Sequence, residues 1–83
     1  MYIEQSSYRF VAYCRPATIA GDISLSILDE TIASFSQGDG RVHEMMQLAK
    51  DKHGEILKWI ELQELGEDGE WSAVGRFYPE SFA

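Results

Sequence analysis

Residues 57–78 read LKWIELQELGEDGEWSAVGRFY and decide the fold, because two apolar runs flank an Asp-Gly pair. Asp68-Gly69 between such runs is the strongest short-range signal of a β-hairpin. A type I′ turn needs positive φ at both central residues, and Asp and Gly tolerate that conformation. The sequence therefore predicts a β-hairpin with its corner at Asp68-Gly69.

The position of the corner also predicts which side chains share a face, because a one-residue slip turns every side chain over. With Asp68-Gly69 at the corner, Glu61 lies opposite Arg76 and Ile60 lies opposite Phe77. These charged and apolar cross-strand pairs favour this register over a four-residue loop, which would set Glu61 opposite Val74. The predicted core face carries Ile60, Leu62, Ala73, Gly75 and Phe77, with Trp71 near the tip. The predicted outer face carries Trp59, Glu61, Gln63, Leu65, Ser72, Val74 and Arg76.

Length and composition predict one globular domain over residues 1–83. The chain is 45 % hydrophobic and 12 % aromatic, which supports a packed core. No apolar run approaches the roughly 18–20 residues of a membrane span. The first residues lack the features of a secretory signal. Cys14 is the single cysteine and suits a reducing compartment, so we expect a cytoplasmic protein without membrane contact.

The residues before the hairpin suggest one strand and two helices. Residues 2–14 alternate with the period of a strand, and Pro16 ends it. Residues 22–37 are ambiguous: the apolar spacing fits a helix with Asp22 as N-cap and Gly38 after its end, but residues 23–27 also alternate with period 2. We favour the helix. A second helix is expected over residues 41–53, stopped by Gly54, and the tail 79–83 is expected to be extended.

The assembled prediction is an α+β domain of order β-α-α-β-β. An antiparallel three-stranded sheet carries two helices packed on one face. The helix residues expected to cover Ile60, Leu62 and Phe77 are Ile27, Ile32, Phe35, Val42 and Met45.

Negative charge gathers in the C-terminal third of the chain. The formal net charge is −7. Residues 55–83 hold seven acids against Lys58 and Arg76, a net of −5. Direct binding to nucleic-acid phosphates needs a basic footprint and is not expected. A protein partner with a basic surface is compatible with this charge.

Two groups of residues could carry chemistry, and neither makes a complete motif. His43-Glu44-Met45-Met46-Gln47 resembles a fragment of the zinc-protease helix motif, but Gln47 stands where the second zinc-binding histidine is needed. Cys14 with a histidine could form a thiolate–imidazolium pair only in an activating environment. We therefore expect no catalytic residues, metal or cofactor.

The sequence favours a small protein–protein interaction module, an inhibitor or adaptor that occupies a basic surface of its partner. In its strongest form, the surface that it occupies is one with which the partner binds nucleic acid. Trp is enriched at binding hot spots, and acids around it suit electrostatic steering. In size and acidity the chain is similar to phage- or plasmid-borne inhibitors. The residues predicted to bind the partner are Trp59, Glu61, Glu64, Glu67, Asp68, Glu70 and Trp71.

Two other functions stay open. The chain could be an obligate subunit, or a homodimer that pairs through an exposed edge of the first strand. More distantly, it could be a small enzyme or ligand binder that uses Cys14 with a lowered pKa and a histidine.

Overall fold

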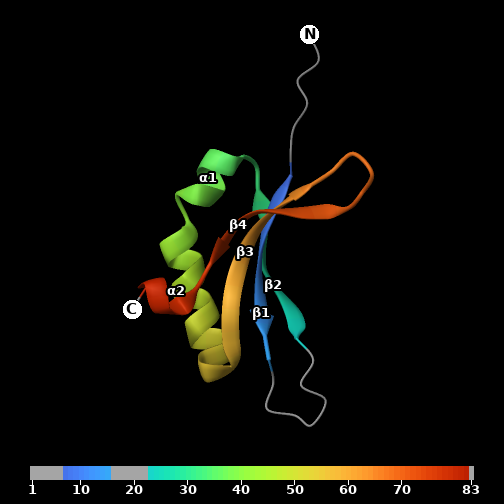
Figure 1. The fold of residues 1–83 in the computed structure, drawn as a ribbon. Coiled ribbons are helices and arrows are strands. Elements are labelled where there is room, and N and C mark those ends of the chain that lie inside the picture. Colours follow the sequence, from blue (N-terminus) through green and yellow to red (C-terminus); the bar gives the residue numbers. More distant parts are fainter. Residues whose placement is uncertain (1–6, 16–22, 83) are drawn as a thin grey trace.

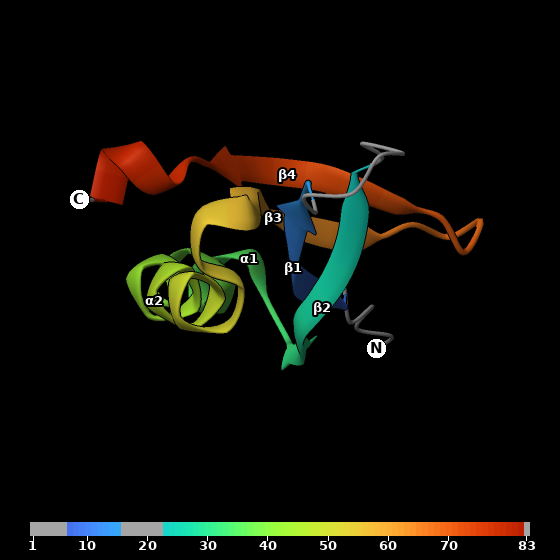
Figure 2. The same cartoon turned by 90° about the horizontal axis from the view of Figure 1, so that it is seen from below.

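A four-stranded antiparallel sheet carries the helices on one face (Figures 1 and 2). The computed structural model describes residues 7–15 and 23–82. The strands are β1 (Tyr8–Cys14), β2 (Ser24–Ile32), β3 (Leu57–Leu65) and β4 (Trp71–Phe77), in the spatial order β2-β1-β3-β4. The helical segments are α1 (Phe35–Asp39), α2 (Val42–His53) and the 3₁₀ turns η1 (Gly54–Ile56) and η2 (Pro79–Phe82). The α+β class is confirmed, but four strands and one main helix replace the predicted three strands and two helices.

The ambiguous segment 22–37 is mostly a strand, so the predicted helix is wrong there. β2 pairs with β1, with Leu25 opposite Tyr13 and Ile27 opposite Val11. Alternating serines and branched aliphatic residues fit a pleated surface better than a helix. Pairing with β1 also satisfies the backbone N–H and C=O groups on the inner side of this edge strand. The predicted N-cap Asp22 and strand residues 2–6 lie outside the described residues.

The main helix, α2, occupies the predicted segment and ends at the predicted glycine. Gly54 has φ of 62°, and its N–H donates to the Lys50 carbonyl. The short helix α1 precedes it, with the Ser34 hydroxyl accepting a hydrogen bond from the Gln37 N–H. Gly38 lies inside α1 rather than after its end. A Cβ there would lie 2.8 Å from the Leu62 methyl carbons, so glycine allows α1 to pack closely against the sheet. None of the helices in the described part of the chain is long and apolar enough to cross a membrane.

The core lies between α2 and one face of the sheet (Figure 2). It contains Phe10 and Ala12 of β1, Ile60 and Leu62 of β3, and the stripe Val42, Met45, Met46 and Ala49 of α2. The predicted packing of Ile32 in this core is confirmed, although from a strand. The predicted packing of Ile27 and Phe35 is wrong, because their side chains are 41 % and 48 % exposed. Leu28 contacts the core instead, since the strand period turns Ile27 to the opposite face.

The C-terminal residues return to the helix, so the extended tail predicted for residues 79–83 is wrong over its described part. η2 spans Pro79–Phe82. The Lys50 ammonium donates to the Phe82 carbonyl at 2.9 Å. The Phe82 ring meets His43 edge-on at 4.9 Å and Phe77 at 6.3 Å. These contacts favour a compact turn against α2 over an extended end.

Candidate interaction surface

The hairpin of β3 and β4 holds the predicted binding residues, and the structure separates them into two groups. Glu67 and Asp68 lie in the loop at its tip, Glu70 directly follows the loop, and all three are exposed. Glu61, Glu64, Trp59 and Trp71 lie along its strands and are buried or half-buried. The exposed group is accessible to a partner, whereas the side chains of the second group are wholly or partly covered by the fold.

The tip is a three-residue loop, Glu67-Asp68-Gly69. The Gly66 N–H donates to the Glu70 carbonyl at 2.8 Å, and the Gly69 N–H donates to the Gly66 carbonyl at 3.0 Å. Gly69 has φ of 83°, whereas no non-glycine residue in the described ranges has positive φ. This is a type I turn followed by a left-handed glycine. The predicted type I′ corner is wrong because Asp68 keeps negative φ, and its carboxylate instead accepts from the Glu70 N–H at 3.0 Å.

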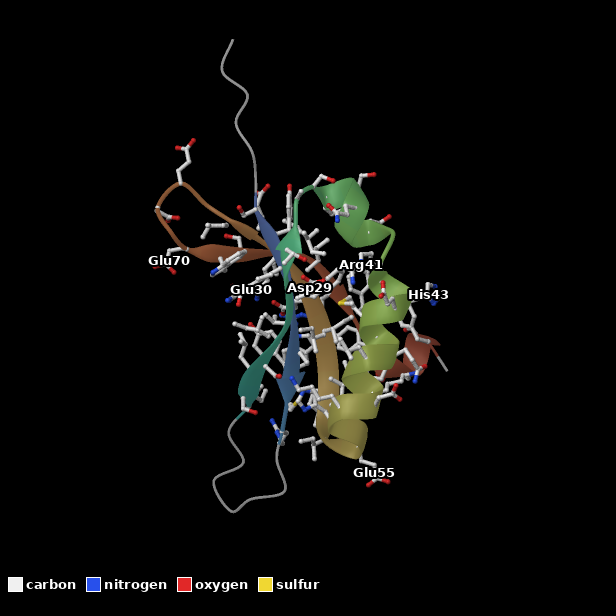
Figure 3. The ribbon with its side chains drawn as sticks, turned by 180° about the vertical axis from the view of Figure 1, so that it is seen from behind. Asp29, Glu30, Arg41, His43, Glu55 and Glu70 are labelled. Atoms are coloured by element: carbon white, nitrogen blue, oxygen red, sulfur yellow. The ribbon has the colours of Figure 1, made fainter. Side chains whose placement is uncertain are left out.

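The loop presents its acids to solvent. It extends away from the helices (Figure 1), and Figure 3 shows Glu70 near its base on the far side from α2. None of the ion pairs formed within residues 7–15 and 23–82 involves Glu67, Asp68 or Glu70. Three carboxylates within four residues are therefore available to a partner, without a competing ion pair in the described part of the chain.

A β-bulge in β4 changes the face of the residues next to the tip. Glu61 lies opposite Arg76 and Ile60 opposite Phe77, as predicted. Between these pairs and the tip the register shifts by one, so that Leu65 lies opposite Trp71. A bulge takes up the extra residue introduced by the three-residue loop. The prediction that Trp71 points to the core is wrong, and Trp71 joins Trp59 on the face opposite the helices.

The Glu61 carboxylate is used by hydrogen bonds within the protein. Its side chain lies on the open face of the sheet, defined as the face opposite α2, yet the residue is only 4 % exposed. One carboxylate oxygen accepts from the Trp59 indole N–H at 2.9 Å and from Arg76 at 2.9 and 3.1 Å. The other accepts from the Gln63 amide at 2.9 Å. A carboxylate with this set of donors is a structural acceptor, so we leave Glu61 out of the proposed surface.

Glu64 is also engaged, on the helix-side face. The Tyr8 hydroxyl donates to its Oε2 at 2.6 Å. Glu64 lies opposite Tyr8 on β1 and opposite Ser72 on β4. It therefore helps to join β1 to the hairpin.

The open face is an ordered layer of aromatic and arginine side chains. The Tyr13 and Trp59 rings stack at 5.1 Å, and Arg76 lies 4.7 Å from the Trp59 ring centre. Arg9 lies 4.2 Å from the Trp71 ring centre. These contacts hold both tryptophans in place.

Gln63 links this layer from strand to strand. Its amide nitrogen donates to the Tyr13 hydroxyl at 3.1 Å, and its carbonyl oxygen accepts from Arg9 at 2.8 Å. Sequence reasoning did not assign Arg9, Tyr13 or Gln63 to a site. The sequence places each of them on one face of its own strand. Only the strand order shows that β1 lies beside β3, which brings the three side chains together.

The described surroundings of Cys14 do not activate its thiol. Its side chain is buried, and burial raises the pKa of the thiol, with the Lys52 charge opposing part of this effect. The enzyme alternative predicted a lowered pKa and is wrong on that point. Burial likewise lowers the pKa of His53, whose Nε2 has no hydrogen-bond partner among the described residues.

His43 does not build a metal site with its helix neighbours. It points away from the sheet (Figure 3) and contacts the Phe82 ring. Over residues 7–15 and 23–82, no three His, Cys, Asp or Glu side chains form a group that could hold a metal ion. The incomplete zinc motif therefore has no completing ligand within this part of the structure.

The first strand does not offer an edge for pairing. β1 lies between β2 and β3 and is hydrogen-bonded to both. The predicted homodimer through the edge of the first strand is therefore wrong in its location. The edges of the sheet are β2 and β4.

Comparisons with protein-family models, with curated proteins and with solved structures find no significant match to this chain.

Proposed function

We propose that this protein is a small interaction module whose hairpin tip docks on a basic surface of a partner protein. The observation that carries the proposal is the group of three exposed carboxylates, Glu67, Asp68 and Glu70, without ion pairs in the described structure. By covering a basic surface, the module would act as an inhibitor or an adaptor. In its strongest form, the carboxylates take the place of nucleic-acid phosphates on that surface.

The loop geometry supports the proposal because it holds the acids in a defined arrangement. Two backbone hydrogen bonds close the loop, and the Asp68 carboxylate bonds to the Glu70 N–H. A preordered loop loses less conformational entropy on binding than a flexible one. The acids can therefore meet cationic side chains at a low ordering cost.

The residues at the base of the loop add an apolar component. Leu65 and Trp71 lie opposite each other across the hairpin, on the open face. Leu65 is exposed, and Trp71 is half-buried under Arg9. An aromatic anchor beside charged groups is typical of binding hot spots. We therefore define the tip surface as Leu65, Glu67, Asp68, Glu70 and Trp71.

The charge of the whole chain favours fast, salt-dependent association. A net charge of −7 attracts a basic partner over a distance of about one Debye length, roughly 8 Å at physiological salt. Added salt should therefore lower the association rate more than it raises the dissociation rate.

The test compares two double charge reversals of equal net charge. Glu67→Lys with Glu70→Lys changes the tip, and Glu55→Lys with Glu80→Lys changes exposed acids outside it. Figure 3 shows Glu55 and Glu70 at opposite ends of the molecule. Each pair moves the net charge from −7 to −3. The tagged proteins are incubated with lysate of the native host at low and high salt, and captured proteins are crosslinked and identified by mass spectrometry.

We expect wild type and the control pair to capture the same basic protein at low salt, crosslinked near the tip. The tip pair should lose most of this capture. Equal capture by the tip pair would contradict the proposal. A partner that is captured equally well at high salt and by the tip variant Glu67→Lys with Glu70→Lys would favour the obligate-subunit alternative.

A further inference from the structure

We propose that the chain forms a two-fold symmetric homodimer in which the outer edges of two β2 strands pair antiparallel about Leu25. This proposal is independent of the function proposed for the hairpin tip. It concerns the opposite side of the sheet, since β2 forms one edge and the β3–β4 hairpin forms the other.

The sequence of the edge is palindromic. Ile23, which directly precedes β2, and the first four residues of β2 read Ile-Ser-Leu-Ser-Ile. If Leu25 lies opposite Leu25 of the second copy, Ile23 lies opposite Ile27 and Ser24 lies opposite Ser26. Side chains that are paired across antiparallel strands share a face, so three apolar pairs form on one face. An isologous interface requires this kind of self-complementarity.

The apolar residues of the edge are half exposed. The exposed fractions are 43 % for Ile23, 43 % for Leu25 and 41 % for Ile27. Leu25 and Ile27 lie opposite Tyr13 and Val11 of β1, so they continue the open face to its boundary. Such a run on an edge strand exposes both backbone hydrogen-bonding groups and apolar side chains to a partner strand.

Charge favours a second copy at this position. Residues 23–27 carry no charged side chain, although the chain has a net charge of −7. Pairing in the proposed register therefore sets no acid opposite another acid. A basic partner strand would gain no opposite charge within these five residues, so a neutral, self-complementary strand is the better match.

The other end of β2 limits the length of the pairing. The register between β1 and β2 shifts twice along Tyr8–Val11, which marks bulges or irregularities in this part of the pair. Exposed Glu30 lies in the same part of β2. Bulges and charges disfavour edge-to-edge pairing. The paired segment should therefore be confined to about five residues.

A short interface predicts a weak dimer. Standard interfaces bury about 800 Å² on each partner, and three half-exposed aliphatic side chains supply only a part of that area. We therefore expect a dissociation constant within the micromolar range, between about 1 µM and 1 mM. Because the two-fold axis reverses the strands, the two hairpin tips would lie at opposite ends of the dimer.

Disulfide trapping tests the register directly. In a Cys14→Ala background, Leu25→Cys places the two new thiols opposite each other. Their Cα atoms would be about 4.5–5.5 Å apart, within the range of a disulfide. Ile27→Cys is the matched control, because four residues of offset separate its two copies by about 13 Å. Under mild oxidation, Leu25→Cys should form covalent dimers at least tenfold faster than Ile27→Cys.

Sedimentation tests the association without a crosslink. The mean mass of wild type should rise toward two chains as the concentration increases, and 1 M salt should not lower it. Leu25→Lys sets two cations opposite each other and should remain monomeric with an unchanged circular dichroism spectrum. Val74→Lys changes a similarly exposed residue on the other edge strand and should behave as wild type.

Several results would overturn the proposal. One is a wild-type chain that stays monomeric throughout the micromolar range. Another is equal trapping of the Leu25→Cys and Ile27→Cys variants. Dissociation by Val74→Lys rather than Leu25→Lys would move the interface to β4. If Leu25→Lys fails to fold, the trapping experiment still decides the question.

Discussion

Glu61 and the tip acids Glu67, Asp68 and Glu70 stand within ten residues of one another and have opposite environments. Glu61 is 4 % exposed and accepts hydrogen bonds from three side chains. The tip acids are exposed and make no ion pair within the described structure. The comparison shows that the number of acids in a segment does not locate a binding surface, because strand order decides which acids the fold itself uses.

The physical cause is the position of β3. It lies between β1 and β4, so the side chains of three strands surround Glu61 on the open face. The loop after Leu65 has no neighbouring strand beyond its own hairpin partner among the described residues. The same residue type is therefore a structural acceptor at one end and a solvated charge at the other.

Glu61→Lys should produce the largest change in stability. It places a cation beside Arg76 and removes the acceptor of the Trp59 N–H and of one Gln63 N–H, which should cost about 3 kcal/mol. Urea unfolding measures the difference from wild type. Glu61→Gln keeps one acceptor oxygen and should cost less. A loss below about 1 kcal/mol for Glu61→Lys would show that the network contributes little.

Gly69→Ala should have the next largest effect. Gly69 has φ of 83°, and a side chain in this conformation costs about 1–2 kcal/mol. No atom lies within 4 Å of the added Cβ, so the cost comes from the backbone alone. Gly40→Ala is the control, since its φ of −69° is normal for alanine. Thermal unfolding of both variants measures the effect, and equal melting temperatures would exclude the observed turn.

Asp29→Asn tests another acid whose carboxylate accepts hydrogen bonds within the protein. Hydrogen bonds from Thr31, at 2.6 and 2.7 Å, lower the pKa of Asp29, and Arg41 at 2.6 Å adds to this effect. A lowered folded-state pKa means that the stabilisation is present above the ordinary value of 3.8 and is lost as the pH falls through the folded value.

The variant should therefore lose about 1 kcal/mol at pH 7, and the difference from wild type should fade below pH 3.8. Urea unfolding across this pH range measures the difference. A constant difference at every pH would show that ionisation of Asp29 does not contribute to stability.

Glu67→Lys with Glu70→Lys should have the smallest effect on stability. Both side chains are exposed and unpaired in the described structure, so the free energy of unfolding should change by less than about 0.5 kcal/mol. The same urea assay measures it beside Glu61→Lys. A loss comparable to that of Glu61→Lys would remove the distinction between the two groups of acids.

Local patterns in the sequence predict part of the fold. The hairpin, the Glu61–Arg76 and Ile60–Phe77 pairs, and helix α2 with its stop at Gly54 are confirmed. Each depends on neighbours in the chain: an Asp-Gly turn signal, an apolar stripe at helical spacing, and a glycine with positive φ. The errors at Asp68 and Trp71 have one origin, since a loop one residue longer shifts the register near the tip and a bulge restores it.

The sequence by itself determined the α+β class, the acidic hairpin and the main helix, because local backbone preferences and side-chain periodicity specify them. Only the tertiary structure decided that residues 24–32 form a strand, that β1 is interior, and that Glu61 is buried while the tip acids are exposed. The physical reason is that the apolar residues of segment 22–37 fit both the spacing of a helix and, over residues 23–27, the alternation of a strand. Pairing with β1 supplied the hydrogen bonds that settled the choice.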